Sequence, residues 1–207
     1  MRTPICVDAV DEYMISAFIQ VRLGSQRLPG KSLKRLHGKE LVLWVVEGVC
    51  AAKRLDQVIL LVPESSHDDD LAAFLMQRGY IVFRGPESDV LTRFALASRA
   101  FPSEAIVRVC ADNPLINPAA IDQLITFFLE GQHDYAFNNV PSSNNAYPDG
   151  FGAEIFKTLL LDQLNLRATG SDREHVTQYL KNHPEIFRVG APQALPGVIG
   201  SDIRLDI

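Results

Sequence analysis

Short apolar segments alternate with longer amphipathic segments along the first two thirds of the chain. Residues 15–21 form a mostly apolar run that predicts a buried strand, and residues 40–52 repeat apolar positions at helical spacing. The same pair of patterns returns three more times. We predict strands at 15–21, 57–62, 80–83 and 105–110, and helices at 40–52, 67–78, 88–101 and 117–130. This alternation indicates a mostly parallel sheet in the strand order 3-2-1-4, with helices on both faces.

The remaining third of the chain is less regular. We predict strands at 134–137, 151–156 and 186–189, helices at 157–167 and 171–182, and a polar loop at 138–150. With 207 residues the chain can bury a core without disulfides or metals. We therefore expect a single α/β domain over residues 1–207, made of a core at 1–130 and a small second lobe at 131–207.

Charge and composition argue against several classes of partner. The net charge of −5 and the pI of about 5.5 argue against binding to duplex nucleic acid or to an acidic membrane surface. No apolar run approaches the ~20 residues that a membrane span needs. Cys6, Cys50 and Cys110 are widely spaced and odd in number, which suits reduced thiols better than disulfides. We expect a cytoplasmic protein with neither nucleic acid nor membrane as partner.

The loop directly after the first strand is the first candidate site. It reads Arg22-Leu-Gly-Ser-Gln-Arg-Leu-Pro-Gly-Lys31 and holds three cations in ten residues of an acidic chain. Ligands of open parallel sheets bind at the carboxyl ends of the strands, where this loop lies. Glycines let backbone N–H groups approach an anion, and guanidinium and ammonium groups suit a polyphosphate. A solvated surface loop is the alternative.

Two acidic features need separate interpretations. Asp112 ends the fourth strand, which lies beside the first strand in the predicted order, so it would face the basic loop. A carboxylate there is suited to Mg²⁺, and a turn-capping residue is the alternative. The run Asp68-Asp69-Asp70 resembles a metal cluster, but favourable placement in the first turn of a helix is the better explanation.

Four further residues have competing explanations. Arg108 lies within an apolar strand, where a structural ion pair is favoured over ligand contact. Ser171 and Glu174 fit a capping box, which would explain both without a function. His175 follows that box. It could have a functional role, or it could be an ordinary helix histidine whose hydrogen bonds are made within the fold.

Four stretches, taken in order, are similar to one family. They are residues 18–31, 83–93 and 107–116, and the pair Tyr147-Pro-Asp-Gly150 with Arg173-Glu-His-Val-Thr177. Together they resemble the spore-coat polysaccharide type of cytidylyltransferase, related to CMP-Kdo and CMP-sialic acid synthetases. The resemblance implies a Rossmann-like nucleotidyltransferase fold, transfer of CMP from CTP to an acidic sugar with release of pyrophosphate in bacterial surface polysaccharide biosynthesis, and a homodimer.

The resemblance also implies roles for individual residues. Residues 1–130 would bind the nucleotide, and residues 131–207 would bind the sugar and form the dimer. Arg22, Lys31 and Asp112 would be catalytic, with Asp112 holding Mg²⁺. The nucleotide would contact Arg22, Gly24, Ser25, Arg27, Lys31, Gly85, Asp89 and Arg93, and the sugar would contact Asp149, Arg173 and His175.

The last residues resemble the start of the family's C-terminal stretch, which leads to a second metal-binding aspartate. In that register the aspartate falls one position beyond Ile207, so Asp206 stands one residue too early. A one-residue offset along a strand turns a side chain to the opposite face. We therefore expect Asp112 to be the single protein carboxylate on the metal. Another sugar nucleotidyltransferase, or a nucleotide-binding protein with weak or no turnover, is the alternative.

Overall fold

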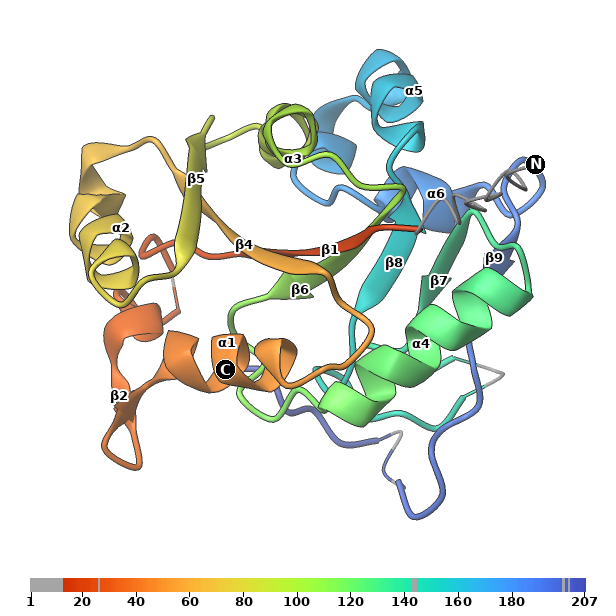
Figure 1. The fold of residues 1–207 in the computed structure, drawn as a ribbon, viewed down its shortest axis with the longest axis horizontal. Helices are drawn as coiled ribbons and strands as arrows, with labels where there is room; N and C mark the ends of the chain where they lie inside the picture. The colour runs from red at the N-terminus through yellow and green to blue at the C-terminus, as the bar shows by residue number, and fades with distance from the viewer. Residues whose placement is uncertain (1–12, 26, 143–144, 199, 201) are drawn as a thin grey trace, which may run out of the picture.

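One sheet runs through the middle of the molecule (Figure 1). The computed structural model describes residues 13–207 except 26, 143–144, 199 and 201, and Cys6 lies outside the described residues. Within them the sheet has seven strands. These are β1 (Ile15–Gln20), β4 (Gln57–Pro63), β5 (Ile81–Gly85), β6 (Ala105–Cys110), β7 (Tyr135–Phe137), β8 (Glu154–Lys157) and β9 (Val189–Gly190).

The strand order is β5-β4-β1-β6-β8-β7-β9. The first four strands of this order are mutually parallel, which confirms the predicted arrangement of the first four strands. Strand β8 is antiparallel to both β6 and β7, and β9 is parallel to β7. The last part of the chain therefore extends the same sheet, and the division at residue 130 stays a prediction.

Two predicted strands of the second lobe are shorter than expected. The strand predicted at 151–156 begins at Glu154, because Gly150 has a φ of 83° and the Ala153 N–H donates to Asn138 Oδ1 at 2.9 Å. The strand predicted at 186–189 is reduced to β9. The N–H groups of Ile186 and Phe187 both donate to the His183 carbonyl, which keeps that segment in a turn.

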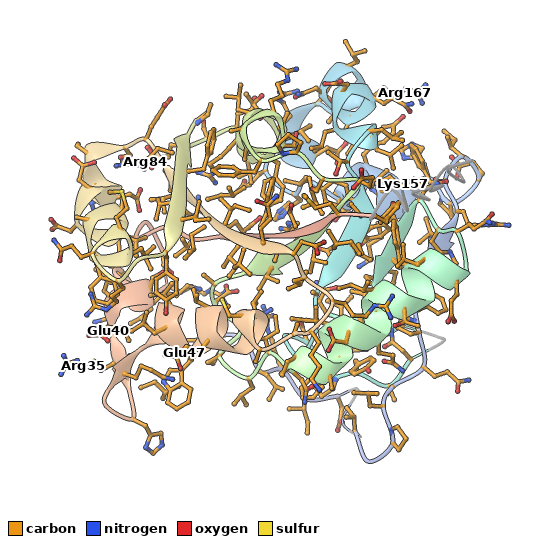
Figure 2. All side chains as sticks on the ribbon, in the orientation of Figure 1. Arg35, Glu40, Glu47, Arg84, Lys157 and Arg167 are labelled. Carbon is orange, nitrogen blue, oxygen red and sulfur yellow. The ribbon has the colours of Figure 1, made fainter. Side chains whose placement is uncertain are left out.

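Six α-helices of the described chain cover the two faces of the sheet (Figure 1). They are α1 (Leu41–Cys50), α2 (Asp69–Met76), α3 (Val90–Ala100), α4 (Pro118–Glu130), α5 (Leu160–Arg167) and α6 (Gln178–Asn182). Side chains alternate between the faces of a strand, so Ala17 and Ile19 pack with α1, α2 and α4, and Phe18 packs with α3, α5 and α6. Figure 2 shows the side chains that fill the space between the sheet and the helices on each of its faces.

A short hairpin separates the basic loop from the first helix. The loop ends in a 3₁₀ turn, η1 (Lys31–Leu33), and strands β2 (Arg35–Leu36) and β3 (Lys39–Glu40) follow. Across this hairpin Arg35 Nε lies 3.2 Å from Glu40 Oε1 (Figure 2). Lys31 and Ser32 therefore do not open an α-helix. A phosphate-binding P-loop needs a helix directly after its Lys-Ser pair, so this loop is not a P-loop. No helix of the described residues is long and apolar enough to cross a membrane.

Candidate active site

A cavity of about 760 Å³ opens where β1 and β6 end. These two strands are neighbours in the sheet (Figure 1), and the cavity lies at the carboxyl edge of the parallel strands, where ligands of such folds bind. Two neighbouring loops and one distant segment bring predicted residues to it. They are Arg22, Gly24, Ser25, Arg27 and Lys31 after β1, Asp112 after β6, and His175 from the last third of the chain.

The backbone of Leu23 organises the basic loop. The Leu23 carbonyl accepts hydrogen bonds from the N–H groups of Ser25 at 2.8 Å and Gly30 at 3.0 Å. Gly30 has a φ of 69°, a conformation that favours glycine. The Ser32 hydroxyl donates to the Arg22 carbonyl at 3.0 Å. These bonds fold the loop so that its cations surround one cavity.

Lys31 joins the basic loop to Asp112. The Lys31 ammonium donates to Asp112 Oδ2 at 2.9 Å and to the backbone oxygen of Ile207 at 2.6 Å. The strand order places Asp112 opposite the loop, as expected from the sequence. Among the described residues no backbone N–H donates to the Asp112 carboxylate, so the turn-cap alternative lacks the hydrogen bond on which it depends.

A buried ion pair forms one wall of the cavity. The Arg108 guanidinium pairs with Glu154 on the neighbouring strand and donates through Nε to Gln20 Oε1 at 3.0 Å. The hydroxyls of Tyr135 and Thr177 donate to Glu154 Oε1 at 2.6 and 2.7 Å. Burial alone would raise the pKa of Glu154, but Arg108 and the two hydroxyls hold it below its usual value. The predicted structural ion pair of Arg108 is confirmed.

Glu174 lines the site, and no α-helix begins where the sequence predicts one. Residues 170–173 are a 3₁₀ turn, η3 (Gly170–Arg173), and α6 begins only after Thr177, so the helix predicted at 171–182 is wrong in its first half. Glu174 and His175 instead line the large cavity. Glu174 Oε1 lies 3.6 Å from Arg22 Nη2, and both side chains are about half exposed.

A smaller cavity of about 120 Å³ adjoins the first and is lined by Arg93. Arg93 is 2% exposed, and its Nε and Nη1 atoms have no hydrogen-bond partner among the described residues. Burial, together with repulsion by Arg22, lowers the pKa of Arg93 to about 10, so the guanidinium stays charged at neutral pH. A Cβ atom at Gly85 would lie 3.1 Å from Arg93 Cγ, so Gly85 leaves room for this side chain.

The sequence profile of the cytidylyltransferase family matches residues 16–201, which include the whole basic loop and Asp112. The chain belongs to the cytidylyltransferase family. It is 34% identical over 177 residues to the spore coat polysaccharide biosynthesis protein SpsF of Bacillus subtilis, a match that covers 83% of this chain and 71% of that protein.

Two further relatives agree with this assignment. A cytidylyltransferase structure from Leptospira borgpetersenii superposes with a TM-score of 0.83 at 28% identity, over 93% of this chain and 80% of that one. A 3-deoxy-manno-octulosonate cytidylyltransferase of Hydrogenovibrio crunogenus is 33% identical over 126 residues, covering 58% of this chain and 49% of that protein. The present cytidylyltransferase is thus related to CMP-Kdo synthetases and has the nucleotidyltransferase fold.

Asp89 and Arg173 of this cytidylyltransferase bind each other and do not line either cavity described above. Asp89 caps α3 by accepting the Thr92 N–H at 2.9 Å, and its other oxygen accepts from Arg173 Nη2 at 2.7 Å and Nε at 2.9 Å. Burial would raise the pKa of Asp89, but these partners hold it below its usual value. The contacts of Asp89 with the nucleotide and of Arg173 with the sugar stay predictions, and in this structure the two side chains bind each other.

Asp149 is also placed away from both cavities. Its backbone pairs with the C-terminal segment, through Asp149 N–H to the Ile203 carbonyl at 3.0 Å and Leu205 N–H to the Asp149 carbonyl at 2.8 Å. The Asp149 carboxylate lies 3.7 Å from Arg204, which also binds Asp206. The Ile207 N–H donates to the Asp112 carbonyl at 3.0 Å. The turn at Tyr147–Gly150 thus holds the C-terminal segment beside the candidate active site.

Sequence reasoning does not place two acidic residues near the site. A capping box is a sufficient local explanation for Glu174, and its position in the cavity depends on how the segment after η3 folds. The dipole of α2 is a sufficient local explanation for Asp68, but Asp68 is 1% exposed and accepts the Leu23 N–H at 2.7 Å. The dipole interpretation fits Asp69 and Asp70, which do lie in the first turn of α2. No sequence signal links position 68 to position 23.

Proposed function

We propose that this cytidylyltransferase transfers CMP from CTP to an acidic sugar and releases pyrophosphate, in the biosynthesis of a bacterial surface polysaccharide. One observation carries the proposal: three cations of one loop and the carboxylate of Asp112 surround a single cavity at the carboxyl edge of the sheet. The names of its relatives, a spore coat polysaccharide protein and a 3-deoxy-manno-octulosonate cytidylyltransferase, support the choice of substrates.

The basic loop would bind the triphosphate. Arg22, Arg27 and Lys31 supply guanidinium and ammonium donors, and Gly24 and Ser25 allow phosphate oxygens to approach the backbone. Arg93 lines the adjoining smaller cavity and would offer its unpaired N–H donors to the cytidine. Gly85 packs against Arg93 and leaves room for its side chain. As the sugar hydroxyl attacks the α-phosphorus, Arg22 and Lys31 would offset the negative charge on the departing pyrophosphate.

The donor set around Asp112 suits Mg²⁺ held jointly with substrate. Within the described residues there is no group of three or more His, Cys, Asp or Glu side chains arranged to hold a metal. Mg²⁺ is commonly bound through one or two carboxylates, with phosphate oxygens and water completing its shell, and Asp112 would be such a carboxylate. When bound, Mg²⁺ would neutralise phosphate charge. Lys31 keeps the Asp112 carboxylate oriented toward the cavity.

The second lobe would supply the sugar side of the cavity. His175 and Glu174 line the same cavity as the basic loop. Either side chain can accept the proton that the attacking hydroxyl loses, and Cys110 cannot, because burial raises its pKa to about 11 and keeps the thiol neutral. The predicted contacts of Asp149 and Arg173 with the sugar would form on binding, since neither residue lines the cavity. A homodimer remains part of the proposal, and sedimentation equilibrium tests it.

Pyrophosphate release measured with each of the four NTPs and a panel of 2-keto-3-deoxy sugars tests the proposal. We expect release with CTP and an acidic sugar, and little with the other nucleotides. Release with another nucleotide or a neutral acceptor would favour a different sugar nucleotidyltransferase. Calorimetric binding of CTP without release across the panel would favour a nucleotide-binding protein. Absence of both binding and release would overturn the proposal.

A further inference from the structure

Asp68 occupies a helix-capping position but does not cap its helix. It precedes the first residue of α2, where an aspartate usually accepts the N–H of the second or third helical residue, a bond that contributes about 1 kcal/mol. Asp68 makes no such bond. Its Oδ1 atom accepts the N–H of Leu23 at 2.7 Å, a residue 45 positions earlier in the chain. The carboxylate therefore serves the basic loop and not its own helix.

The backbone of Leu23 makes the hydrogen bonds that fold the basic loop. Its carbonyl accepts the N–H groups of both Ser25 and Gly30, and its side chain is buried in the core on the α1 face of the sheet. The chain neighbours of Leu23 are Arg22 and Gly24, which both line the large cavity. Fixing the Leu23 amide thus fixes the direction in which these two neighbours leave the core.

The burial of Asp68 makes this bond costly to lose. Asp68 is 1% exposed, and among the described residues it has no Lys, Arg or His within ion-pair distance. A buried carboxylate needs hydrogen bonds to offset its lost hydration. Asp68 also attracts Arg93, whose guanidinium lines the smaller cavity. One buried carboxylate therefore acts on both parts of the candidate active site without lining either of them.

We infer that Asp68 is a positioning residue, which holds the Leu23 amide so that the basic loop is preorganised for the triphosphate. The inference rests on the proposed function only in naming the triphosphate as the ligand of the loop. Preorganisation lowers the ordering cost of binding, so loss of the anchor should appear mainly as weaker nucleotide affinity. The chemistry of the attack is left to the residues that line the cavity.

Two variants and one matched control test the inference. Asp68→Ala removes the acceptor, and we expect the dissociation constant of CTP, measured by calorimetry, to rise at least about tenfold. Asp68→Asn keeps an Oδ1 acceptor, so its affinity should stay within about threefold of that of the unmodified protein. Asp70→Asn makes the same chemical change at an exposed position of α2 and should leave CTP affinity unchanged.

Hydrogen exchange of the Leu23 amide gives a readout that does not depend on nucleotide. We expect slow exchange in the unmodified protein, faster exchange in Asp68→Ala, and slow exchange in Asp68→Asn. Rapid exchange in the unmodified protein would overturn the inference even if Asp68→Ala does not fold. So would an Asp68→Ala variant that unfolds at lower temperature but binds CTP normally, or an equal loss of affinity in both variants. If the unmodified protein binds no CTP, the proposed function fails, and the exchange rates alone decide the role of Asp68.

Discussion

Lys31 and Arg27 reach the same cavity from one loop, but their surroundings differ. Lys31 donates to the Asp112 carboxylate, so Lys31→Ala removes a phosphate donor and also leaves a negative charge uncompensated. We expect Arg27→Ala to weaken CTP binding by about 1.5–3 kcal/mol, and Lys31→Ala to weaken it further. Calorimetry measures both. Lys34→Ala, at an exposed position outside the cavity, is the matched control, and unchanged affinity in both loop variants would exclude the assignment.

Asp112→Asn separates a metal ligand from a turn residue. An amide is a poorer ligand for Mg²⁺ than a carboxylate, so the variant should fold normally and lose Mg²⁺-dependent pyrophosphate release. Binding of CTP without Mg²⁺ should persist, because the change removes a negative charge that faces the triphosphate. Unfolding temperature and metal-free CTP affinity are the controls. Release at the rate of the unmodified protein would exclude Asp112 as a metal ligand.

Among single residues, the sequence predicts the position of those that directly follow a predicted strand. The cations of residues 22–31 and the carboxylate of Asp112 follow strands that periodicity identifies, so their meeting at one edge of the sheet could be expected. Asp68 and Glu174 could not be placed in the same way. Their partners, Leu23 and Arg22, are far away in sequence, and each acidic residue has a simple local explanation that competes with the tertiary contact.

At the scale of elements, the buried pair of Arg108 and Glu154 joins β6 to β8. Glu154→Ala would leave the Arg108 guanidinium buried without its carboxylate, and we expect the free energy of unfolding to fall by about 3–5 kcal/mol. Urea denaturation measures it. The double variant Arg108→Met with Glu154→Met removes both charges and should recover much of the loss. A loss below about 1 kcal/mol in Glu154→Ala would contradict a network that depends on this carboxylate.

The elements themselves are predicted best where periodicity is strong. The first four strands and four helices occur where the pattern indicates them, because apolar side chains at period two or 3.6 must be buried. The segment at 171–182 differs, since Ser171 and Glu174 fit a capping box although the chain forms a 3₁₀ turn there. The bonds of Arg173 to Asp89 and Thr92 hold that turn, and they come from a part of the chain 80 residues and more away.

At the scale of the whole molecule, acid should destabilise the fold. Burial alone would raise the pKa values of Asp89, Asp134 and Glu154, but hydrogen bonds and nearby cations hold all three below their usual values. A carboxyl group with a depressed pKa stabilises the folded state above its unfolded-state pKa, about 4, and this contribution is lost as pH falls through the folded-state value. We expect the contribution of these three carboxyl groups to be constant from pH 7 to about 5 and to be lost below that.

Urea denaturation between pH 7 and pH 3 measures this dependence. Glu154→Gln cannot titrate at that position and should flatten part of the acid loss relative to the unmodified protein. Asp70→Asn, at an exposed position, should leave the curve unchanged. A free energy of unfolding that stays constant down to pH 3 would show that these carboxyl groups have the same pKa in the folded and unfolded states.

The pair of Arg22 and Glu174 has a consequence for how substrate enters. Both residues line the cavity, Arg22 from the loop after β1 and Glu174 from the segment between η3 and α6, and both side chains are about half exposed. Exposed pairs of this kind contribute between about 0 and 1 kcal/mol and are screened by salt. An incoming triphosphate can therefore displace Glu174 from Arg22 at little cost. Glu174 thus pairs with Arg22 in the free protein and gives way to a more highly charged ligand.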